Sequence, residues 1–231
     1  MATAIRASSL VLEPVIEVLP STIDPGNEPP PGLLTPAQRQ RRMQEALDRA
    51  GIGTLRVDGL WALARDVVDL PGACEVIVEA TLRNRKPESR RNVASEMADA
   101  SVREHWVDYV LRCGIAIRVD GIVRAWPGCC ADWEALRELR QALDANASEE
   151  RFIWIGHDGG ALSISAADAD MPTLRTCDDE RGDPDEWLVT RAVLQHELEA
   201  AWDVVDRFEA VAIPILDARL GGRTLRSRQR S

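Results

Sequence analysis

The sequence predicts an α+β protein in which an antiparallel sheet built from β-hairpins packs against several amphipathic helices. Two segments alternate apolar and polar residues on either side of a glycine-containing turn, which is typical of hairpins. Other segments repeat apolar residues every three to four positions, which is typical of helices. The chain has 231 residues, of which 45% are hydrophobic and 29% charged. That composition suits one globular domain with a real core.

Residues 1–34 are predicted to form an extended N-terminal arm with a proline-rich linker. The run LVLEPVIEV at 10–18 is apolar enough to dock as a short strand on a sheet edge. Residues 20–35, PSTIDPGNEPPPGLLT, contain five prolines and follow neither a helical nor an alternating period. The folded domain is therefore expected to begin at residue 35.

The next segments predict helices with one strand among them. Thr35 can cap a helix that runs to Gly51, and residues 59–69 predict a second, short helix. The β-branched run CEVIVEATL at 74–82 favours a strand that joins the sheet, with a helix as the alternative. Apolar residues over 89–113 recur with a period near 3.6, which predicts a long amphipathic helix.

Two hairpins are predicted in the middle of the chain. Asp120-Gly121 separates IAIRV from IVRAW, and Asp-Gly between alternating runs is a strong hairpin signal over 115–126. RFIWI and ALSISA flank the turn GHDGG and predict a second hairpin over 152–166. A helix over 130–145 lies between them in the sequence.

The last third of the chain predicts a loop, a helix and a tail. Residues 167–185 are rich in Asp, Glu, Pro and Gly, as in a loop, and a long helix is expected from Pro184 to Ile213. Pro214 should end or kink that helix. Residues 219–231 predict a mobile basic tail, so the single domain is expected to span 35–218.

Charge and targeting signals restrict the function classes. The formal net charge is −10, which argues against a nucleic-acid binder except through the arginine-rich tail. The chain has no apolar run long enough to span a membrane and no signal-peptide pattern, so a cytoplasmic protein without a membrane partner is expected. Five cysteines, an odd number, do not suggest a disulfide framework. Lys86 is the single lysine among 28 basic residues, a bias typical of a GC-rich bacterial genome.

One group of residues could carry catalysis. Cys129 and Cys130 lie between a Pro-Gly turn and a predicted helix start, where the helix dipole lowers a thiol pKa. His157 and Asp158 lie at the tip of the second predicted hairpin. If the two turns meet, these residues would form a Cys-His-Asp arrangement of a thiol-dependent enzyme. The alternative is that both cysteines are small buried residues that seal the helix against the sheet.

No metal or cofactor site is expected. His196 and Glu197 begin the pattern His-Glu-x-x-His, but Ala200 stands where the second histidine belongs. The adjacent cysteines do not have the Cys-x-x-Cys spacing of a zinc knuckle.

Two features suggest a protein partner. The loop CDDERGDPDE at 177–186 concentrates negative charge and suits a basic partner, and Trp133 could anchor an interface because tryptophan is enriched in binding hot spots. The predicted partner-binding residues are Trp133, Asp178, Asp179, Glu180, Asp183, Asp185 and Glu186.

PGCCADW, followed about twenty residues later by WIGHD, resembles segments of uncharacterised bacterial proteins, some of them similar to immunity proteins that neutralise secreted toxins. The resemblance covers residues 115–166. It implies an acidic cytoplasmic inhibitor that works by occlusion.

We therefore expect a non-enzymatic protein-binding or inhibitor protein that occludes a cationic protein partner. A thiol-dependent enzyme is the first alternative. A structural or assembly component is the second.

Overall fold

The computed structural model describes residues 4–18, 35–56, 60–84, 111–128, 132–145, 149–156, 161–177 and 185–220. Their fold divides into two compact units. The first unit contains the described residues up to Pro14 together with Arg112–Val205, and the second contains Val15–Leu111 and the rest of the last helix from Asp206. The boundary between the units therefore falls inside one strand, β2, and inside one helix, α7.

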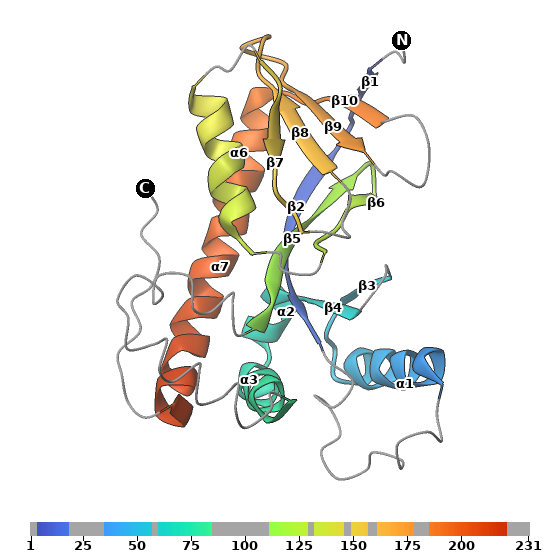
Figure 1. The fold of residues 1–231 in the computed structure, drawn as a ribbon, viewed down its shortest axis with the longest axis vertical. Helices are drawn as coiled ribbons and strands as arrows, with labels where there is room; N and C mark the ends of the chain where they lie inside the picture. Colours follow the sequence, from blue (N-terminus) through green and yellow to red (C-terminus); the bar gives the residue numbers. More distant parts are fainter. Residues whose placement is uncertain are drawn as a thin grey trace. The chain divides into compact units, whose positions relative to one another are not determined.

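Sheet A of the first unit has five strands in the order β1-β10-β9-β8-β7 (Figure 1). Neighbouring strands pair antiparallel, except that β1 and β10 are parallel. The strands are β1 (Ile5–Arg6), β7 (Arg151–Ile153), β8 (Ala161–Ser165), β9 (Thr173–Cys177) and β10 (Asp185–Leu188).

One face of sheet A is apolar because side chains alternate between its two faces. Leu162, Ile164 and Leu174 are buried on that face. Two helices, α6 (Glu134–Asp144) and the part of α7 (Arg191–Leu220) within the first unit, run side by side next to the sheet (Figure 1). An ion pair between Arg140 and Glu199 joins these two helices.

The first unit also contains the hairpin of β5 (Cys113–Val119) and β6 (Ile122–Ala125). Asp120 and Gly121 form its turn, both with positive φ, at 50° and 79°. Glycine and aspartate tolerate this region better than most residues do, which explains the Asp-Gly signal in the sequence. In the strand order of sheet B, β3-β4-β2-β5-β6, this hairpin follows β2 (Leu10–Glu17).

The second unit holds the rest of sheet B and three of the helices. The end of β2 pairs antiparallel with β4, with Val15 opposite Leu63. Thr35 caps α1 through a capping box, because its hydroxyl accepts the N–H of Gln38 and the Gln38 side chain accepts the N–H of Thr35. The elements of this unit besides β2 and α7 are α1 (Pro36–Arg49), β3 (Thr54–Arg56), β4 (Leu60–Leu63), α2 (Ala64–Asp69) and α3 (Ala73–Asn84).

The α+β class is confirmed, with helices and two mainly antiparallel sheets. Both predicted hairpins form, but β5–β6 belongs to sheet B and β7–β8 belongs to sheet A. The prediction of a single sheet that contains both hairpins was wrong. Strand patterns specify which face of a strand is buried, but they do not specify which strands become neighbours.

Residues 74–82 form a helix and not the favoured strand. Cys74, Ile77, Val78 and Thr81 are buried, and their spacing of three, four and seven residues is that of one helix face. The β-branched residues favoured a strand by propensity, but the helical period decided the structure. Similarly, the predicted helix over 59–69 starts as strand β4 and becomes helical only from Ala64.

Three predictions near the C-terminus are corrected. The expected loop over 167–185 contains β9, and the expected helix start at Pro184 is replaced by strand β10. Helix α7 begins at Arg191, where the Thr190 hydroxyl accepts the N–H of Val193. The helix continues through Pro214 to Leu220, past the expected end at Ile213, so of the two expected effects of Pro214 the helix end did not occur.

Other predictions lie outside the described residues. They concern the linker before residue 35, most of the helix over 89–113, and the tail after Leu220. Within 111–113, Cys113 already belongs to β5. The domain boundaries at 34 and 218 stay predictions.

Candidate functional site

Most of the site residues predicted from the sequence lie outside the part of the chain that the structure describes. Cys129, Cys130, His157 and Asp158, and the acidic residues Asp178, Asp179, Glu180 and Asp183, lie outside the described residues. Asp185 and Glu186 belong to β10, and Glu186 forms an ion pair with Arg175.

Trp133 lies in the core and is 0% exposed. Its indole N–H donates a hydrogen bond to the Gly114 carbonyl over 3.1 Å. A partner cannot touch this side chain in the structure, so Trp133 is a packing residue that joins the start of α6 to β5 and not the interface anchor that the sequence suggested.

Two aromatic side chains lie on the surface at β7, the edge strand of sheet A in the described part of the chain. Phe152 is 72% exposed, and Trp154, the residue that follows β7 after Ile153, is 49% exposed. Ile153 between them is buried. Side chains two residues apart in an extended segment lie on the same face, so the two rings are neighbours on one surface.

A carboxylate fixes the backbone of Trp154. Oε2 of Glu138, a residue of α6, accepts the Trp154 backbone N–H over 3.0 Å. This bond satisfies a backbone donor at the end of an edge strand and ties α6 to the residue that follows β7. We call Phe152, Trp154 and Glu138 the β7 surface.

Polar residues continue the sheet face next to Phe152. Ser163 stands opposite Phe152 in the register, and its hydroxyl donates a hydrogen bond to Glu150. Arg175 on β9 forms ion pairs with both Glu150 and Glu186. The positive charge of Arg175 is therefore offset on this face.

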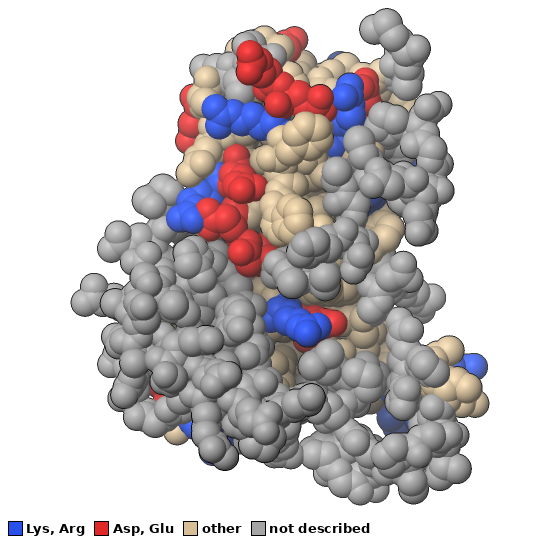
Figure 2. Space-filling model, viewed as in Figure 1, with Lys and Arg blue, Asp and Glu red and all other residues tan. Residues whose placement is uncertain are grey.

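Charged side chains border the uncharged surface. Figure 2 shows uncharged side chains where Figure 1 draws β7, with acidic side chains and some basic ones beside them over α6. An exposed aromatic surface with acidic side chains at its border favours contact with a partner that is apolar in part and positively charged in part.

The segments that precede the two turns with the candidate catalytic residues lie next to each other. The Gly128 N–H donates to the Ile155 carbonyl over 2.7 Å. A side chain at Gly156, which has a φ of +103°, would come within 2.7 Å of the Gly128 backbone. In the sequence, Cys129 follows Gly128 and His157 follows Gly156. The segments that lead into the two pairs of candidate residues are therefore in contact.

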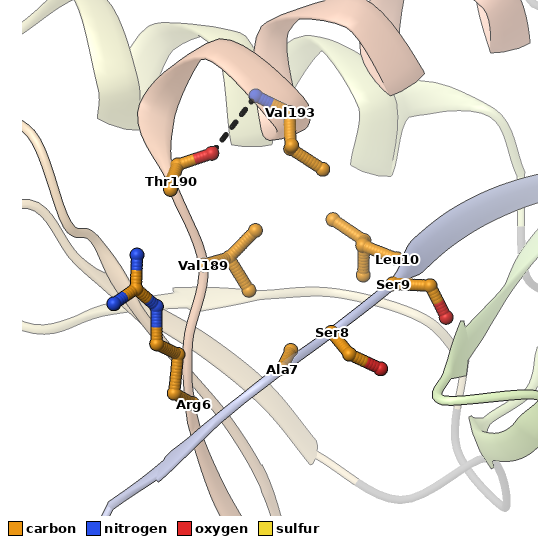
Figure 3. A pocket seen from close by; sticks show the side chains of 8 residues that line it. All are labelled: Arg6, Ala7, Ser8, Ser9, Leu10, Val189, Thr190 and Val193. Atoms are coloured by element: carbon orange, nitrogen blue, oxygen red, sulfur yellow. Dashed lines mark hydrogen bonds between the residues drawn. The ribbon is translucent and has the colours of Figure 1, made fainter.

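A cavity of about 300 Å³ lies between the segment that joins β1 to β2 and the start of α7 (Figure 3). Leu10, Val189 and Val193 point toward it, while the hydroxyls of Ser8 and Ser9 point away. Its lining contains no cysteine, histidine or carboxylate. The cavity is therefore a shallow, mainly apolar depression, and its lining offers no groups for acid-base catalysis. Its lining residues are Arg6, Ala7, Ser8, Ser9, Leu10, Val189, Thr190 and Val193.

The part of the chain that the structure describes contains no group of three or more His, Cys, Asp or Glu side chains that could hold a metal ion. His196 is exposed on α7. Asp168 accepts the backbone N–H groups of Asp170 and Met171, so it closes a turn.

The thiols of Cys74 and Cys113 are buried. Burial raises the pKa of the Cys74 thiol to about 12, and Cys113 is the first residue of β5 and is 0% exposed. A substrate cannot reach a buried thiol, so neither cysteine is a candidate for catalysis.

Comparison with known proteins gave no relative. A scan against protein-family models, a search of curated proteins and a search of solved structures each found no match. The resemblance of PGCCADW and WIGHD to immunity-type proteins therefore stays a prediction. Within the described ranges, no helix is both long enough and apolar enough to cross a membrane.

The sequence did not predict the β7 surface. In RFIWI every position after the arginine is apolar, so alternation does not show which face is exposed. The pattern therefore did not distinguish the exposed Phe152 and Trp154 from the buried Ile153 between them. The available signal was strand position, because an edge strand leaves room for exposed side chains, but the strand order is not readable from the sequence.

Proposed function

We propose that the chain is a protein-binding protein that occludes a cationic partner through the β7 surface. The observation that carries the proposal is the pair of exposed aromatic rings, Phe152 and Trp154, on an edge strand with acidic side chains beside them. The two rings expose roughly 200–300 Å² together, which suits the centre of a binding hot spot. The formal net charge of −10 supports attraction of a positively charged partner.

The proposal places the interface on a different surface from the acidic loop that the sequence indicated. That loop lies outside the described residues except for Asp185 and Glu186. The acidic charges of the loop and of α6 would act together on the rate of encounter, because electrostatic steering depends on the summed charge distribution.

The test compares exposed-residue variants of one protein. Phe152→Ser and Trp154→Ser remove the rings, and Ile122→Ser, at a 54% exposed position on another edge strand, is the matched control. Each variant is used to capture partners from an extract of the source organism, with quantitative mass spectrometry as the measurement. A partner captured by the wild type and the control should be lost from both ring variants.

The captured partner is then titrated against all four proteins. Truncation of a hot-spot residue costs about 2 kcal/mol or more, so each ring variant should weaken the dissociation constant by about 30-fold or more. Melting temperatures should change little, since both rings are largely exposed. Equal affinity of the ring variants and the control for the same partner would place the interface elsewhere.

A second function, a thiol-dependent enzyme, is favoured by the contact between Gly128 and Gly156. In this function Cys129 or Cys130 is the nucleophile, His157 is the general base, and Asp158 orients the imidazole. The rate of alkylation of each cysteine is measured against pH in the folded protein. An apparent pKa well below the free value of about 8.5 at Cys129 or Cys130, and its loss in His157→Ala, would support the enzyme. Slow labelling with an ordinary or raised pKa would contradict it.

A further inference from the structure

The cavity between β1 and the start of α7 has an apolar floor. Leu10 and Val189 line it and are 3% and 2% exposed, while Val193 is 40% exposed and its side chain points toward the same space (Figure 3). The volume of about 300 Å³ is at the lower end of the range for small-molecule sites, roughly 300–1,000 Å³. At about 30 Å³ for each water-sized group, it holds about ten such groups. The cavity therefore suits a small molecule with a short apolar chain.

Hydrogen bonds fix the backbone around this cavity. The Ala7 N–H donates to the Leu188 carbonyl over 3.0 Å, which continues the pairing of β1 with β10. Asp120 accepts the Ser8 hydroxyl and the backbone N–H groups of Ser8 and Ser9. The hydroxyls of Ser8 and Ser9 point away from the cavity (Figure 3), so the Asp120 carboxylate binds the Ser8 hydroxyl on the side away from the cavity. The space is therefore formed before a ligand arrives, which reduces the entropy cost of binding.

Arg6 adds a positive charge to the lining. Its side chain extends from β1 in the direction of Thr190 (Figure 3). Within the described ranges no acidic side chain forms an ion pair with Arg6, and the cavity lining contains no carboxylate. Arg191, the first residue of α7, is instead engaged by the carbonyls of Ala169 and Leu143. A ligand in the cavity therefore meets apolar side chains and the guanidinium of Arg6.

We propose that the cavity binds a small carboxylate with an unbranched apolar chain of about six carbons, a length set by the volume. The chain covers Leu10, Val189 and Val193, and the carboxylate pairs with the guanidinium of Arg6, whose two parallel N–H groups match a carboxylate. The inference goes beyond the proposed function, because no residue of the β7 surface lines this cavity.

The probe is hexanoate, and its match is 1-hexanol, which has the same chain and no charge. Binding to the full chain is followed by the NMR methyl resonances of Val189 and Val193. Hexanoate should move both sets at millimolar concentration, and hexanol should bind about 2- to 5-fold more weakly, as expected for an exposed ion pair. The formal net charge of −10 does not attract anions in general, so a preference for hexanoate reports a local cation.

The length of the chain tests the apolar floor. Butanoate has the same charge and two methylene groups fewer than hexanoate. Because each buried methylene contributes to binding, butanoate should bind about 4- to 15-fold more weakly than hexanoate.

Two variants separate the two contacts, each with a matched control. Arg6→Gln removes the charge, and its control is Arg151→Gln, an exposed arginine on the opposite edge strand of sheet A. Val193→Phe fills part of the space, and its control is Val211→Phe, at another 40% exposed valine of α7. Arg6→Gln should bind hexanoate and hexanol equally. Val193→Phe should weaken both at least threefold, with the Val189 methyl groups as the reporter.

Three results would overturn the inference. The Val189 resonances could stay fixed at tens of millimolar hexanoate, or hexanol could bind the wild type as tightly as hexanoate does. Val193→Phe could bind hexanoate as well as its Val211→Phe control, which would place the binding outside the cavity. Each of these results would leave the proposed function intact, because that function is tested by the partner lost from Phe152→Ser and Trp154→Ser.

Discussion

Asp120 ties the first strands of the chain to the β5–β6 turn. Its Oδ1 accepts the Ser8 hydroxyl over 2.6 Å and the backbone N–H groups of Ser8 and Ser9, each over 2.8 Å. The hydrogen bond from the Ser8 side chain, followed by the one from the Ser9 backbone, lowers the pKa of Asp120. These bonds form with the ionised carboxylate, so the contact depends on pH.

The sign of this pH dependence follows from the lowered pKa. The unfolded value is near 4, so the carboxylate stabilises the folded protein fully above that pH and loses the effect as pH falls through the lower folded value. Asp120→Asn keeps a residue that tolerates positive φ. Its urea midpoint should lie below that of the wild type by a constant amount above about pH 5, and the difference should shrink below about pH 4.

A titration checks the cause. Ser8→Ala removes the hydroxyl that lowers the pKa of Asp120 most, so this pKa, measured from the carboxyl carbon resonance, should move up toward the ordinary value. An unmoved pKa would show that the Ser8 hydroxyl does not hold the carboxylate.

The thiol of Cys74 is expected to resist alkylation in the folded protein. Its pKa of about 12 means that the thiol is protonated at pH 8. Iodoacetamide should leave Cys74 unmodified in the folded protein and modify it in urea, as mass spectrometry of peptides will show. Rapid modification without denaturant would mean that α3 opens easily.

At the residue scale, sequence patterns predicted turns better than surfaces. Thr35 and Asp120-Gly121 behave as predicted, since their conformations depend on local chemistry. The burial of Trp133 and the exposure of Trp154 could not be predicted in the same way. A tryptophan side chain is compatible with the core and with the surface, and only the fold decides which of the two is covered.

Among the elements, α6 depends on its first tryptophan. Trp133→Phe should destabilise the protein by about 1–3 kcal/mol, because the buried Gly114 carbonyl loses its donor. The control is Trp202→Phe, a buried tryptophan on α7 whose indole makes no hydrogen bond to any described residue. Equal losses of unfolding free energy in the two variants would show that ring area, and not the hydrogen bond, matters.

Helix α7 contains a proline that weakens it. Pro214 is exposed inside the helix and cannot donate to the carbonyl four residues earlier. Pro214→Ala should restore that bond and raise the unfolding free energy by about 1–2 kcal/mol, since the greater freedom of the unfolded chain offsets part of the roughly 3 kcal/mol preference. Chemical denaturation measures the change. A lower stability would show that the proline ring packs favourably where it is.

Among the elements, those with a clear period of apolar residues were predicted correctly. Segments that change from strand to helix were not. The hairpin over 115–126 has a clean alternation and a strong turn. Residues 59–69 change from strand to helix at Ala64 without glycine or proline to mark the change, so no local signal was present.

For the molecule as a whole, β2 contributes to the core more than a docked arm would. Leu10, Leu12, Val15 and Ile16 are all buried. At about 1.5–3 kcal/mol for each buried side chain, their loss equals the whole stability of a typical domain, which is about 5–15 kcal/mol.

Deletion of residues 1–18 should therefore abolish cooperative thermal unfolding by circular dichroism. Deletion of 221–231 is the control for shortening and should leave the melting temperature unchanged if the sequence-based prediction of a tail outside the core is right. A cooperative transition in the chain without β2 would show that the strand is dispensable.

The sequence predicted the α+β class, because composition and period identify the kinds of element. It did not predict two sheets or the sharing of β2 and α7 between two units, since both depend on contacts between residues far apart in the chain.

This sharing affects how the protein is made. A ribosome extends the chain at about 5–20 residues per second, so β2 emerges roughly 10–40 seconds before the end of α7. The first unit needs α7 up to Val205, and the second needs it from Asp206. The first unit is complete only when Val205 has left the ribosome and the second only when Leu220 has, so a nascent chain carries β2 without its full set of partners for almost its whole synthesis. Prematurely ended chains should therefore be substrates for chaperones and proteases, and none should accumulate as a folded half of the protein.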